Sequence, residues 1–228
     1  VFDLITERLF DELEARGELD NTLLVITADH GQGLLDGMDR HGWSKHRLIY
    51  DWSIRVPLIV VLPGEEAHAG TSVAAQVRTI DVMPTVLEWI DVPIPRTCDG
   101  TSLIPFLYGD TPPDWRTEIQ FEFDFRTYFR NAHKTVLGLD IDQCALAVIR
   151  DEHYKYVNFD ALPPLFFDLE KDPGQFNNVA EDPAYAARVL DYTQKMLNWR
   201  LHYAERTLTG YIATPGELLD RHAGKTGF

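Results

Sequence analysis

An apolar run that ends in an acid, a histidine and a glycine is the feature that most constrains this chain. Residues 23–27 read LLVIT, and Asp29, His30 and Gly31 follow almost at once. An unbroken run with branched side chains and no polar alternation is typical of a parallel strand that is covered on both faces. Ligands collect at the carboxyl ends of strands in open parallel sheets. We therefore expect Asp29 and His30 to lie at a binding site.

The elements predicted around this strand follow one another as in an α/β protein. Apolar residues at helical spacing predict an amphipathic helix over residues 2–16, ended by Gly17. A second buried strand is predicted over residues 56–62, and a helix capped by Asp81 over residues 81–90. The order helix, strand, loop, strand, helix indicates an α/β fold with a parallel sheet.

The pattern changes after residue 114. Residues 145–159 predict two short strands around a polar turn at 151–153, and residues 164–175 predict a third strand and another turn. Such hairpins indicate a small antiparallel sheet. A long helix is predicted from Asp182-Pro183, with one stripe formed by Leu190, Leu197 and Leu201. We therefore predict two domains, residues 1–114 and residues 115–228.

The charge balance limits the partners of the chain. Its 228 residues carry 36 acidic and 21 basic side chains, a formal net charge of −15. Nucleic acids and anionic membrane surfaces attract basic patches, so neither is an expected partner. A bound metal ion can still invert the field of one pocket, so an anionic substrate is compatible with this charge.

The two cysteines and the hydropathy of the chain indicate the cellular compartment of the protein. Cys98 and Cys144 lie in unlike contexts without metal-type spacing, which predicts two free thiols in a reducing compartment. No apolar run approaches the roughly 20 residues that span a bilayer. We expect a cytoplasmic protein. The periplasm is the alternative, because the natural N-terminus is expected to be missing from this sequence.

Asp29 and His30 are the first candidate site residues. A carboxylate oxygen and an imidazole nitrogen are both good ligands for a divalent cation, and Gly31 leaves room for a close approach of the backbone. The alternative is a capping aspartate beside a solvent-facing histidine. The sequence HGWSK, residues 41–45, begins twelve residues after Asp29, and YDWSIRVPLIVVLPG follows at residues 50–64. The three segments in this order are much more specific than any one of them.

In this order the segments resemble the sulfatase and phosphonate monoester hydrolase branch of the alkaline phosphatase superfamily. Residues 77–95, 99–109 and 154–183 are also similar to segments of that family, so the resemblance covers residues 1 to about 200. It implies a partial alkaline-phosphatase-like parallel-sheet core over 1–114. A C-terminal subdomain with a small antiparallel sheet, a long helix and an oligomerisation-type tail would follow over 115–228.

The resemblance also implies roles for individual residues. Asp29 and His30 would be metal ligands, and Lys45 would touch the charged oxygens of the substrate. His41 has three roles open to it: to protonate the leaving group, to contact the substrate, or to hold the loop. Arg55 either pins the entrance of the second strand or binds substrate. The loop between His30 and His41 is a few residues longer than in the family, which bears on the assignment of Lys45.

One family motif is absent from this sequence. The nucleophile of these enzymes is a Cys or Ser in the pattern C/S-x-P/A-x-R, whereas Cys98 precedes DGTS and Cys144 precedes ALAV. The early acidic metal ligands of the family are absent too. We therefore interpret the chain as the C-terminal half of such an enzyme and expect it to be inactive alone.

The predicted function is metal-dependent hydrolysis of a small-molecule sulfate or phosphonate/phosphate ester, by a homo-oligomer in the full-length protein. The metal is Mn, Zn or Ca, and a nitrogen ligand suits manganese or zinc better than calcium. The preference for manganese or zinc favours a phosphonate or phosphate ester as the substrate over a sulfate ester. The alternative function is a non-catalytic half-fold retained for binding or assembly. A phosphopentomutase-like or phosphoglycerate mutase-like relative is disfavoured, because residues 166–183 resemble the sulfatase branch specifically.

Overall fold

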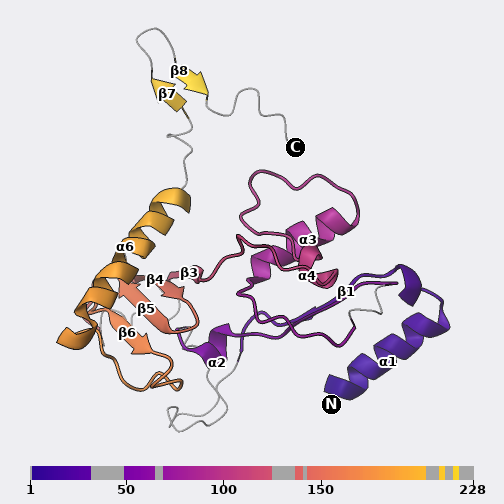
Figure 1. The fold of residues 1–228 in the computed structure, drawn as a ribbon, viewed down its shortest axis with the longest axis horizontal. Helices are drawn as coiled ribbons and strands as arrows, with labels where there is room; N and C mark the ends of the chain where they lie inside the picture. Colours follow the sequence, from indigo (N-terminus) through magenta and orange to yellow (C-terminus); the bar gives the residue numbers. More distant parts are fainter. Residues whose placement is uncertain are drawn as a thin grey trace. The chain divides into compact units, whose positions relative to one another are not determined.

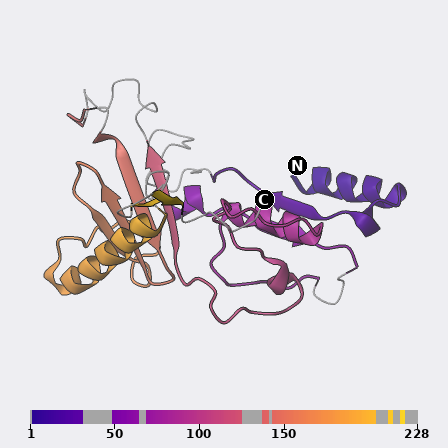
Figure 2. The same ribbon diagram turned by 90° about the horizontal axis from the view of Figure 1, so that it is seen from above.

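A computed structural model describes residues 2–31, 49–64, 69–124, 137–140, 143–203, 211–213 and 218–220. The chain divides into two compact units, with the boundary between Trp115 and Arg116. The short segment that ends at Tyr50 belongs to the second unit, whereas Asp51 begins a stretch of the first. Figures 1 and 2 show the elements of each unit.

The first unit begins with a helix that its own sequence delimits. Helix α1 covers Phe2–Ala15, and Gly17 follows it with a φ of 66°, a left-handed conformation that glycine adopts without strain. The predicted helix over 2–16 is thereby confirmed. The other elements of this unit are η1 (Leu19–Asn21), β1 (Leu24–Thr27), α2 (Asp51–Ile54), β2 (Leu58–Val61), η3 (Thr79–Asp81), α3 (Val82–Trp89) and α4 (Ile104–Leu107).

Both predicted core strands are present, but they do not run parallel to each other. β1 and β2 pair antiparallel, with Leu24 opposite Val61 and Thr27 opposite Leu58. The expectation of parallel neighbours was therefore wrong for this pair. A continuous apolar run is typical of parallel strands covered on both faces but does not require them. In the structure both strands are only partly buried, and Ile59 is 52% exposed.

The helix predicted at Asp81 is present as α3, and the Asp81 side chain connects it to neighbouring segments. The Asp81 carboxylate is buried and accepts hydrogen bonds from the amides of Arg78 (2.7 Å) and Thr101 (2.9 Å). The hydroxyl of Thr85 donates to the carbonyl oxygen of Asp81 (2.6 Å) and accepts from the amide of Leu103 (2.9 Å). Since Asp81 makes no side-chain cap to α3 itself, its carboxylate joins the helix to the loop that leads to α4.

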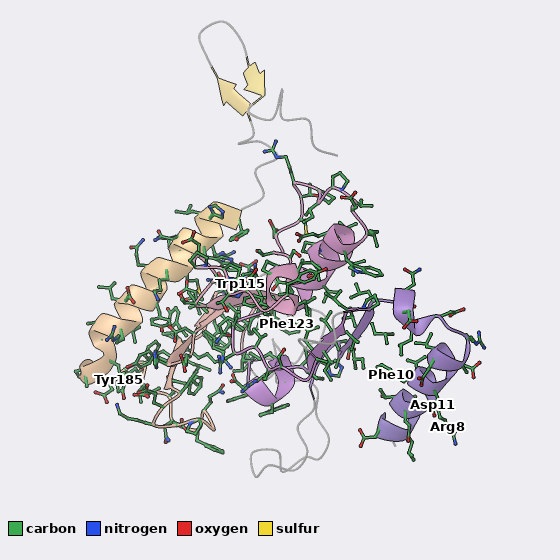
Figure 3. All side chains as sticks on the ribbon, turned by 45° about the vertical axis from the view of Figure 1, so that its right-hand side comes forward. Arg8, Phe10, Asp11, Trp115, Phe123 and Tyr185 are labelled. Atoms are coloured by element: carbon green, nitrogen blue, oxygen red, sulfur yellow. The ribbon has the colours of Figure 1, made fainter. Side chains whose placement is uncertain are left out.

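Trp115 closes the first unit (Figure 3). Its ring packs edge-on against Phe106 of α4, with centroids 4.7 Å apart, and its indole N–H donates to the carbonyl oxygen of Gln76 at 2.8 Å. These contacts hold the end of the first unit to α4 and to the segment before η3.

The second unit contains the predicted antiparallel sheet. Its order is β3-β4-β5-β6, and all neighbours are antiparallel. The strands are β3 (Ile119–Asp124), β4 (Ala145–Arg150), β5 (Tyr154–Phe159) and β6 (Leu165–Asp168). β4 to β6 are the three predicted strands, which are confirmed, and β3 is an additional one. The unit also holds η5 (Pro183–Tyr185), α6 (Ala186–Tyr203) and the hairpin of β7 (Tyr211–Ala213) with β8 (Leu218–Asp220).

Helix α6 covers one face of this sheet (Figure 1). Tyr192 and Met196 are buried there in a cluster with Ile149 and Phe166. The opposite face has its own buried cluster around Val148, Val157 and Cys144, to which the partly buried Ile49 contributes. The predicted leucine stripe of α6 belongs to neither of these two buried clusters. Leu190, Leu197 and Leu201 are all exposed, Leu190 to 70%.

Two properties expected from composition can be checked in the described residues. Cys98 and Cys144 are both free cysteines. Every described helix is too short or too polar to cross a bilayer.

Candidate functional site

Asp29 and His30 follow the end of β1 after a single residue, and they lie side by side. The Asp29 Oδ2 and His30 Nε2 atoms are 3.6 Å apart. The Asp29 side chain is 88% exposed and that of His30 is 32% exposed, so both groups are open to a ligand from outside. The other carboxylate oxygen of Asp29 accepts from the His30 amide at 2.9 Å, which limits the orientation of the carboxylate.

The imidazole of His30 is oriented by the next peptide. Its Nδ1 atom lies 2.7 Å from the carbonyl oxygen of Gly31. A carbonyl oxygen can only accept, so Nδ1 carries the proton in this contact, and a neutral ring keeps the lone pair on Nε2. Metal-bound histidines usually donate their second nitrogen to a carbonyl or carboxylate in this way. The nitrogen nearer to Asp29 is therefore the one available to a cation.

Gly31 is packed against the turn that precedes β2. Its amide donates to the carbonyl oxygen of Ser53 at 2.7 Å. A Cβ atom at position 31 would lie 2.0 Å from the carbonyl oxygen of Trp52, a distance that excludes any side chain. The expected close backbone approach at Gly31 is confirmed, and the partner is α2.

The spacing of Asp29 and His30 suits one divalent cation. Zinc binds imidazole nitrogen and carboxylate oxygen at about 2.0–2.2 Å, so two ligand atoms 3.6 Å apart can contact the same ion. Among the described residues, no cluster brings together three or more His, Cys, Asp or Glu side chains that could hold a metal. The pair therefore supplies part of a coordination sphere, and the remaining ligands would come from elsewhere.

Two predicted site residues, His41 and Lys45, lie outside the described residues, and their roles stay predictions. Arg55 is exposed and directly follows α2, and its amide donates to the carbonyl oxygen of Asp51 at 2.8 Å. This bond involves only the backbone of Arg55, so both of its proposed roles remain open.

Ser53 is a residue of this site that the sequence reasoning missed. It is 0% exposed, and no partner within hydrogen-bonding distance of its Oγ atom is found in the described part of the chain. The only sequence signal was its position in YDWSIRVP, directly before the buried strand. Burial of a serine in a four-residue helix depends on tertiary packing and could not be read from that pattern.

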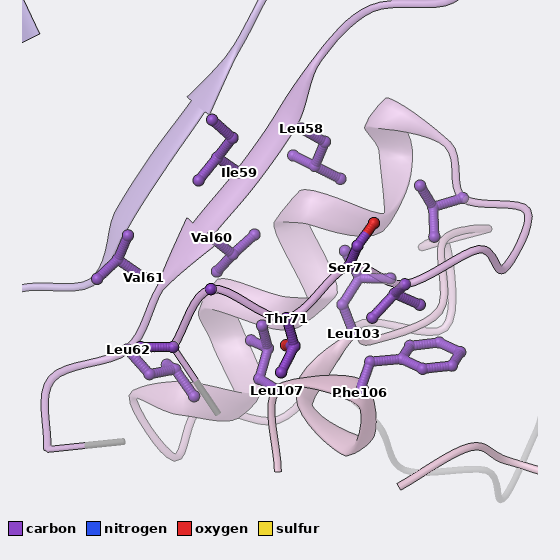
Figure 4. A pocket seen from close by; sticks show the side chains of 14 residues that line it. Leu58, Ile59, Val60, Val61, Leu62, Thr71, Ser72, Leu103, Phe106 and Leu107 are labelled. Atoms are coloured by element: carbon purple, nitrogen blue, oxygen red, sulfur yellow. The ribbon is translucent and has the colours of Figure 1, made fainter. Parts of the chain in front are cut away.

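A separate apolar pocket of about 520 Å³ lies beside β2 (Figure 4). Its described lining includes Leu58, Val60, Leu103, Phe106 and Leu107, and the only side-chain oxygens are the hydroxyls of Thr71 and Ser72. Without a carboxylate, imidazole or thiolate among those residues, the pocket offers no strong ligand to a cation. The candidate metal centre is therefore at the end of β1 and not here.

The clearest electrostatic perturbation is in the second unit. The Lys171 ammonium (2.8 Å) and the Tyr185 hydroxyl (2.6 Å) both donate to Asp168 Oδ2. These hydrogen bonds lower the pKa of Asp168 from 3.8 to about 2, and they raise the pKa of Lys171. Tyr185 is the last residue of η5, directly before α6 (Figure 3), so the cluster joins β6 and the turn after it to the start of that helix. All three groups are satisfied by one another, which indicates a structural role.

The sequence and the fold both match known hydrolases. The family model of N-sulphoglucosamine sulphohydrolase, C-terminal, matches residues 39–202. The "multifunctional alkaline phosphatase superfamily protein PehA" of Trinickia caryophylli is 48% identical over 96% of this chain and 43% of its own length. The N-acetylglucosamine-6-O-sulfatase of Bacteroides thetaiotaomicron is 32% identical over 82% of this chain and 33% of its own length.

A solved structure gives the same result for the fold. The phosphonate monoester hydrolase of Agrobacterium radiobacter superposes with a TM-score of 0.80 and 37% identity. The match covers 94% of this chain and 42% of that enzyme. The mixed α/β, alkaline-phosphatase-like fold class is thereby confirmed. The chain spans less than half the length of each of these three proteins.

Proposed function

The chain belongs to the N-sulphoglucosamine sulphohydrolase C-terminal family, and from this membership we propose that it is the C-terminal part of a metal-dependent ester hydrolase. The substrate class is a small sulfate, phosphonate or phosphate ester. The observation that carries the proposal is the Asp29–His30 pair, whose ligand atoms lie 3.6 Å apart at the end of β1. Ligands in related open sheets collect at this end of a strand.

Within this proposal each residue has a limited task. Asp29 and His30 hold the cation, and the Gly31 carbonyl keeps His30 Nε2 available by accepting a hydrogen bond from Nδ1–H. When bound, a divalent cation lowers the pKa of a nucleophilic hydroxyl and polarises an ester oxygen. Lys45 neutralises charge on the non-bridging oxygens as the ester bond breaks. His41 protonates the leaving group, contacts the substrate or holds the loop.

Two observations support a phosphonate or phosphate ester over a sulfate ester. The nitrogen ligand from His30 suits manganese or zinc better than calcium. The phosphonate monoester hydrolase of Agrobacterium radiobacter has 37% identity and a TM-score of 0.80 with this chain. We propose Mn²⁺ or Zn²⁺ as the metal and Ca²⁺ as the alternative.

The nucleophile is proposed to lie outside these 228 residues. The pattern C/S-x-P/A-x-R does not occur in the sequence, and the chain spans 43% of the length of the PehA relative. Since Asp29 and His30 alone cannot attack an ester, we expect the chain by itself to be inactive. In the complete enzyme the exposed leucines of α6 would form part of a contact between copies.

The missing motif also favours the second function, a half-fold kept for binding or assembly. The two are separated by measuring hydrolysis of an aryl sulfate, an aryl phosphonate and a phosphodiester, with and without Mn²⁺. The protein from its native source and the 228-residue chain are compared, together with the intact mass of the former. Mn²⁺-dependent turnover by the native protein, lost in Asp29→Ala, supports the hydrolase. A native mass equal to that of this chain, without turnover, supports the assembly function.

A further inference from the structure

Ser53 is connected to the imidazole of the candidate metal centre through Gly31. Its carbonyl oxygen accepts the Gly31 amide at 2.7 Å, and the Gly31 carbonyl oxygen lies 2.7 Å from His30 Nδ1. The point where a Gly31 Cβ would be lies 3.2 Å from the Ser53 Cα atom. Trp52 and Ser53 of helix α2 are therefore in direct contact with Gly31, the residue whose carbonyl oxygen orients His30.

The hydroxyl of Ser53 is not explained by packing. The side chain is 0% exposed, and its Oγ atom has no hydrogen-bond partner among the described residues. Leaving a buried hydroxyl unpaired is destabilising, so alanine would fill this space at lower free energy if packing were the only requirement. The other orphaned atom found in the described ranges is Arg78 Nε, whose guanidinium is already held through Nη2 by the carbonyl of Asp99. Of these two residues, Ser53 is the one whose side chain has no hydrogen-bond partner in the described part of the chain.

We propose that Ser53 is a positioning residue of the metal centre. Its carbonyl holds Gly31, which orients His30, and its buried hydroxyl hydrogen-bonds an oxygen atom in the ligand shell of the bound cation. The inference rests on the proposed function, because it requires a cation at Asp29 and His30. In this proposal, helix α2 (Asp51–Ile54) supports the ligands of the cation. Groups that support metal ligands in this way typically change metal affinity by about 10- to 100-fold when they are removed.

The decisive variant is Ser53→Ala, measured by Mn²⁺ titration of the full-length hydrolase, with free Mn²⁺ followed by its electron paramagnetic resonance signal. We expect the dissociation constant for Mn²⁺ to rise by about 10- to 100-fold. The melting temperature of the metal-free variant is expected to equal or exceed that of the unaltered protein, because an unpaired hydroxyl has been removed. An unchanged Mn²⁺ affinity overturns the proposal. A fall in affinity with an equal fall in metal-free stability also overturns it, because that result describes a merely structural residue.

Two further variants separate the causes. Ser102 is also buried in the first unit, but its Oγ accepts from the Ile104 amide at 3.2 Å. Ser102→Ala should lower the melting temperature and leave Mn²⁺ affinity unchanged. Ser53→Cys replaces the hydroxyl by a somewhat larger thiol that is only a weak donor. It should therefore lose affinity as Ser53→Ala does, and retained affinity contradicts the inference. If Asp29→Ala binds Mn²⁺ as tightly as the unaltered protein, the metal centre itself is wrong, which is a different failure from an unaffected Ser53→Ala.

Discussion

The amide of Gly31 donates to the carbonyl oxygen of Ser53 at 2.7 Å, and this hydrogen bond ties the end of β1 to α2. The two backbones are so close that the carbonyl oxygen of Trp52 occupies the space of a Cβ atom at position 31. The glycine after Asp29 and His30 is therefore required by packing. The same contact determines where the candidate metal ligands are held, because His30 is oriented by the Gly31 carbonyl.

Gly31→Ala should damage both stability and metal binding. The added methyl group collides with backbone, which cannot rotate away as a side chain can, so we expect a loss of about 1–3 kcal/mol in unfolding free energy. Mn²⁺ affinity should fall as well, because the peptide that orients His30 is displaced. Thermal unfolding and Mn²⁺ titration measure the two effects. In the control Gly17→Ala, which has open space around it, stability should fall by about 1 kcal/mol from left-handed strain, without a change in metal affinity. Equal metal affinities in Gly31→Ala and the unaltered protein would contradict this account.

Lys45→Ala in the full-length hydrolase tests the predicted role of the loop after β1. Removing one group that stabilises transition-state charge lowers kcat by about 100- to 1000-fold. Mn²⁺ affinity should stay the same, because Lys45 is not proposed as a metal ligand. Steady-state kinetics on the best ester of the substrate panel provide the measurement. Turnover near that of the unaltered enzyme would remove Lys45 from the catalytic site.

Asp168 should make the second unit sensitive to acid. Its folded-state pKa of about 2 lies below the ordinary 3.8, so its stabilising contribution is complete above pH 3.8 and is lost as the pH falls through 2. The contribution is on the order of 1–2 kcal/mol, since Lys171 is largely exposed and partly screened. Asp168→Asn should lower stability at pH 7 and flatten its decline between pH 4 and pH 2, as followed by denaturant unfolding. Asp160→Asn, at an exposed position, is the control. If the unfolding free energy declined with pH in the same way in both variants, Asp168 would not be the source of the acid sensitivity.

Tyr192 and Asp151 link α6 to the turn between β4 and β5. The Tyr192 hydroxyl donates to Asp151 Oδ2, while Oδ1 of the same carboxylate accepts from the amides of His153 and Tyr154. Burial and this hydrogen bond raise the pKa of Tyr192, which keeps it a donor throughout the neutral range. Tyr192→Phe should cost about 1.5–3 kcal/mol, as expected for a hydrogen bond to a charged group.

A double-mutant cycle of Tyr192→Phe with Asp151→Asn isolates this pair. We expect a coupling energy of at least about 0.5 kcal/mol in denaturant unfolding. Tyr156→Phe is the control, because its hydroxyl makes a longer bond of 3.3 Å to Asn158. Additive losses in the cycle would mean that the pair contributes nothing of its own.

The exposed leucines of α6 test the proposed oligomer. Leu197→Glu places a charge in the stripe of Leu190, Leu197 and Leu201, and should lower the mass of the full-length protein in light scattering. Asn198→Glu introduces the same charge on the flank of the helix and should leave the mass unchanged. If Leu197→Glu keeps the oligomeric mass, the contact lies elsewhere.

Local patterns in the sequence determined much of this protein. Apolar spacing and Gly17 were sufficient to predict α1, because a helix and its left-handed end depend on neighbouring residues. The polar turn between β4 and β5 could be predicted for the same reason. The pair Asp29 and His30 could also be identified, because the two residues are neighbours in the sequence. Of the candidate site, the sequence could therefore supply the ligand pair, whose members are neighbours in the chain.

Tertiary structure decided what depends on residues far apart in the chain. The antiparallel pairing of β1 with β2 is a tertiary contact, and a short apolar run can form a strand of either direction. Helix α6 carries two apolar stripes, and only packing on the sheet buries Tyr192 and Met196 while Leu197 stays exposed. Ser53 is an ordinary polar residue in the sequence. Its hydroxyl is buried and has no partner among the described residues, because the fold brings α2 against Gly31, and burial is a property of the whole chain.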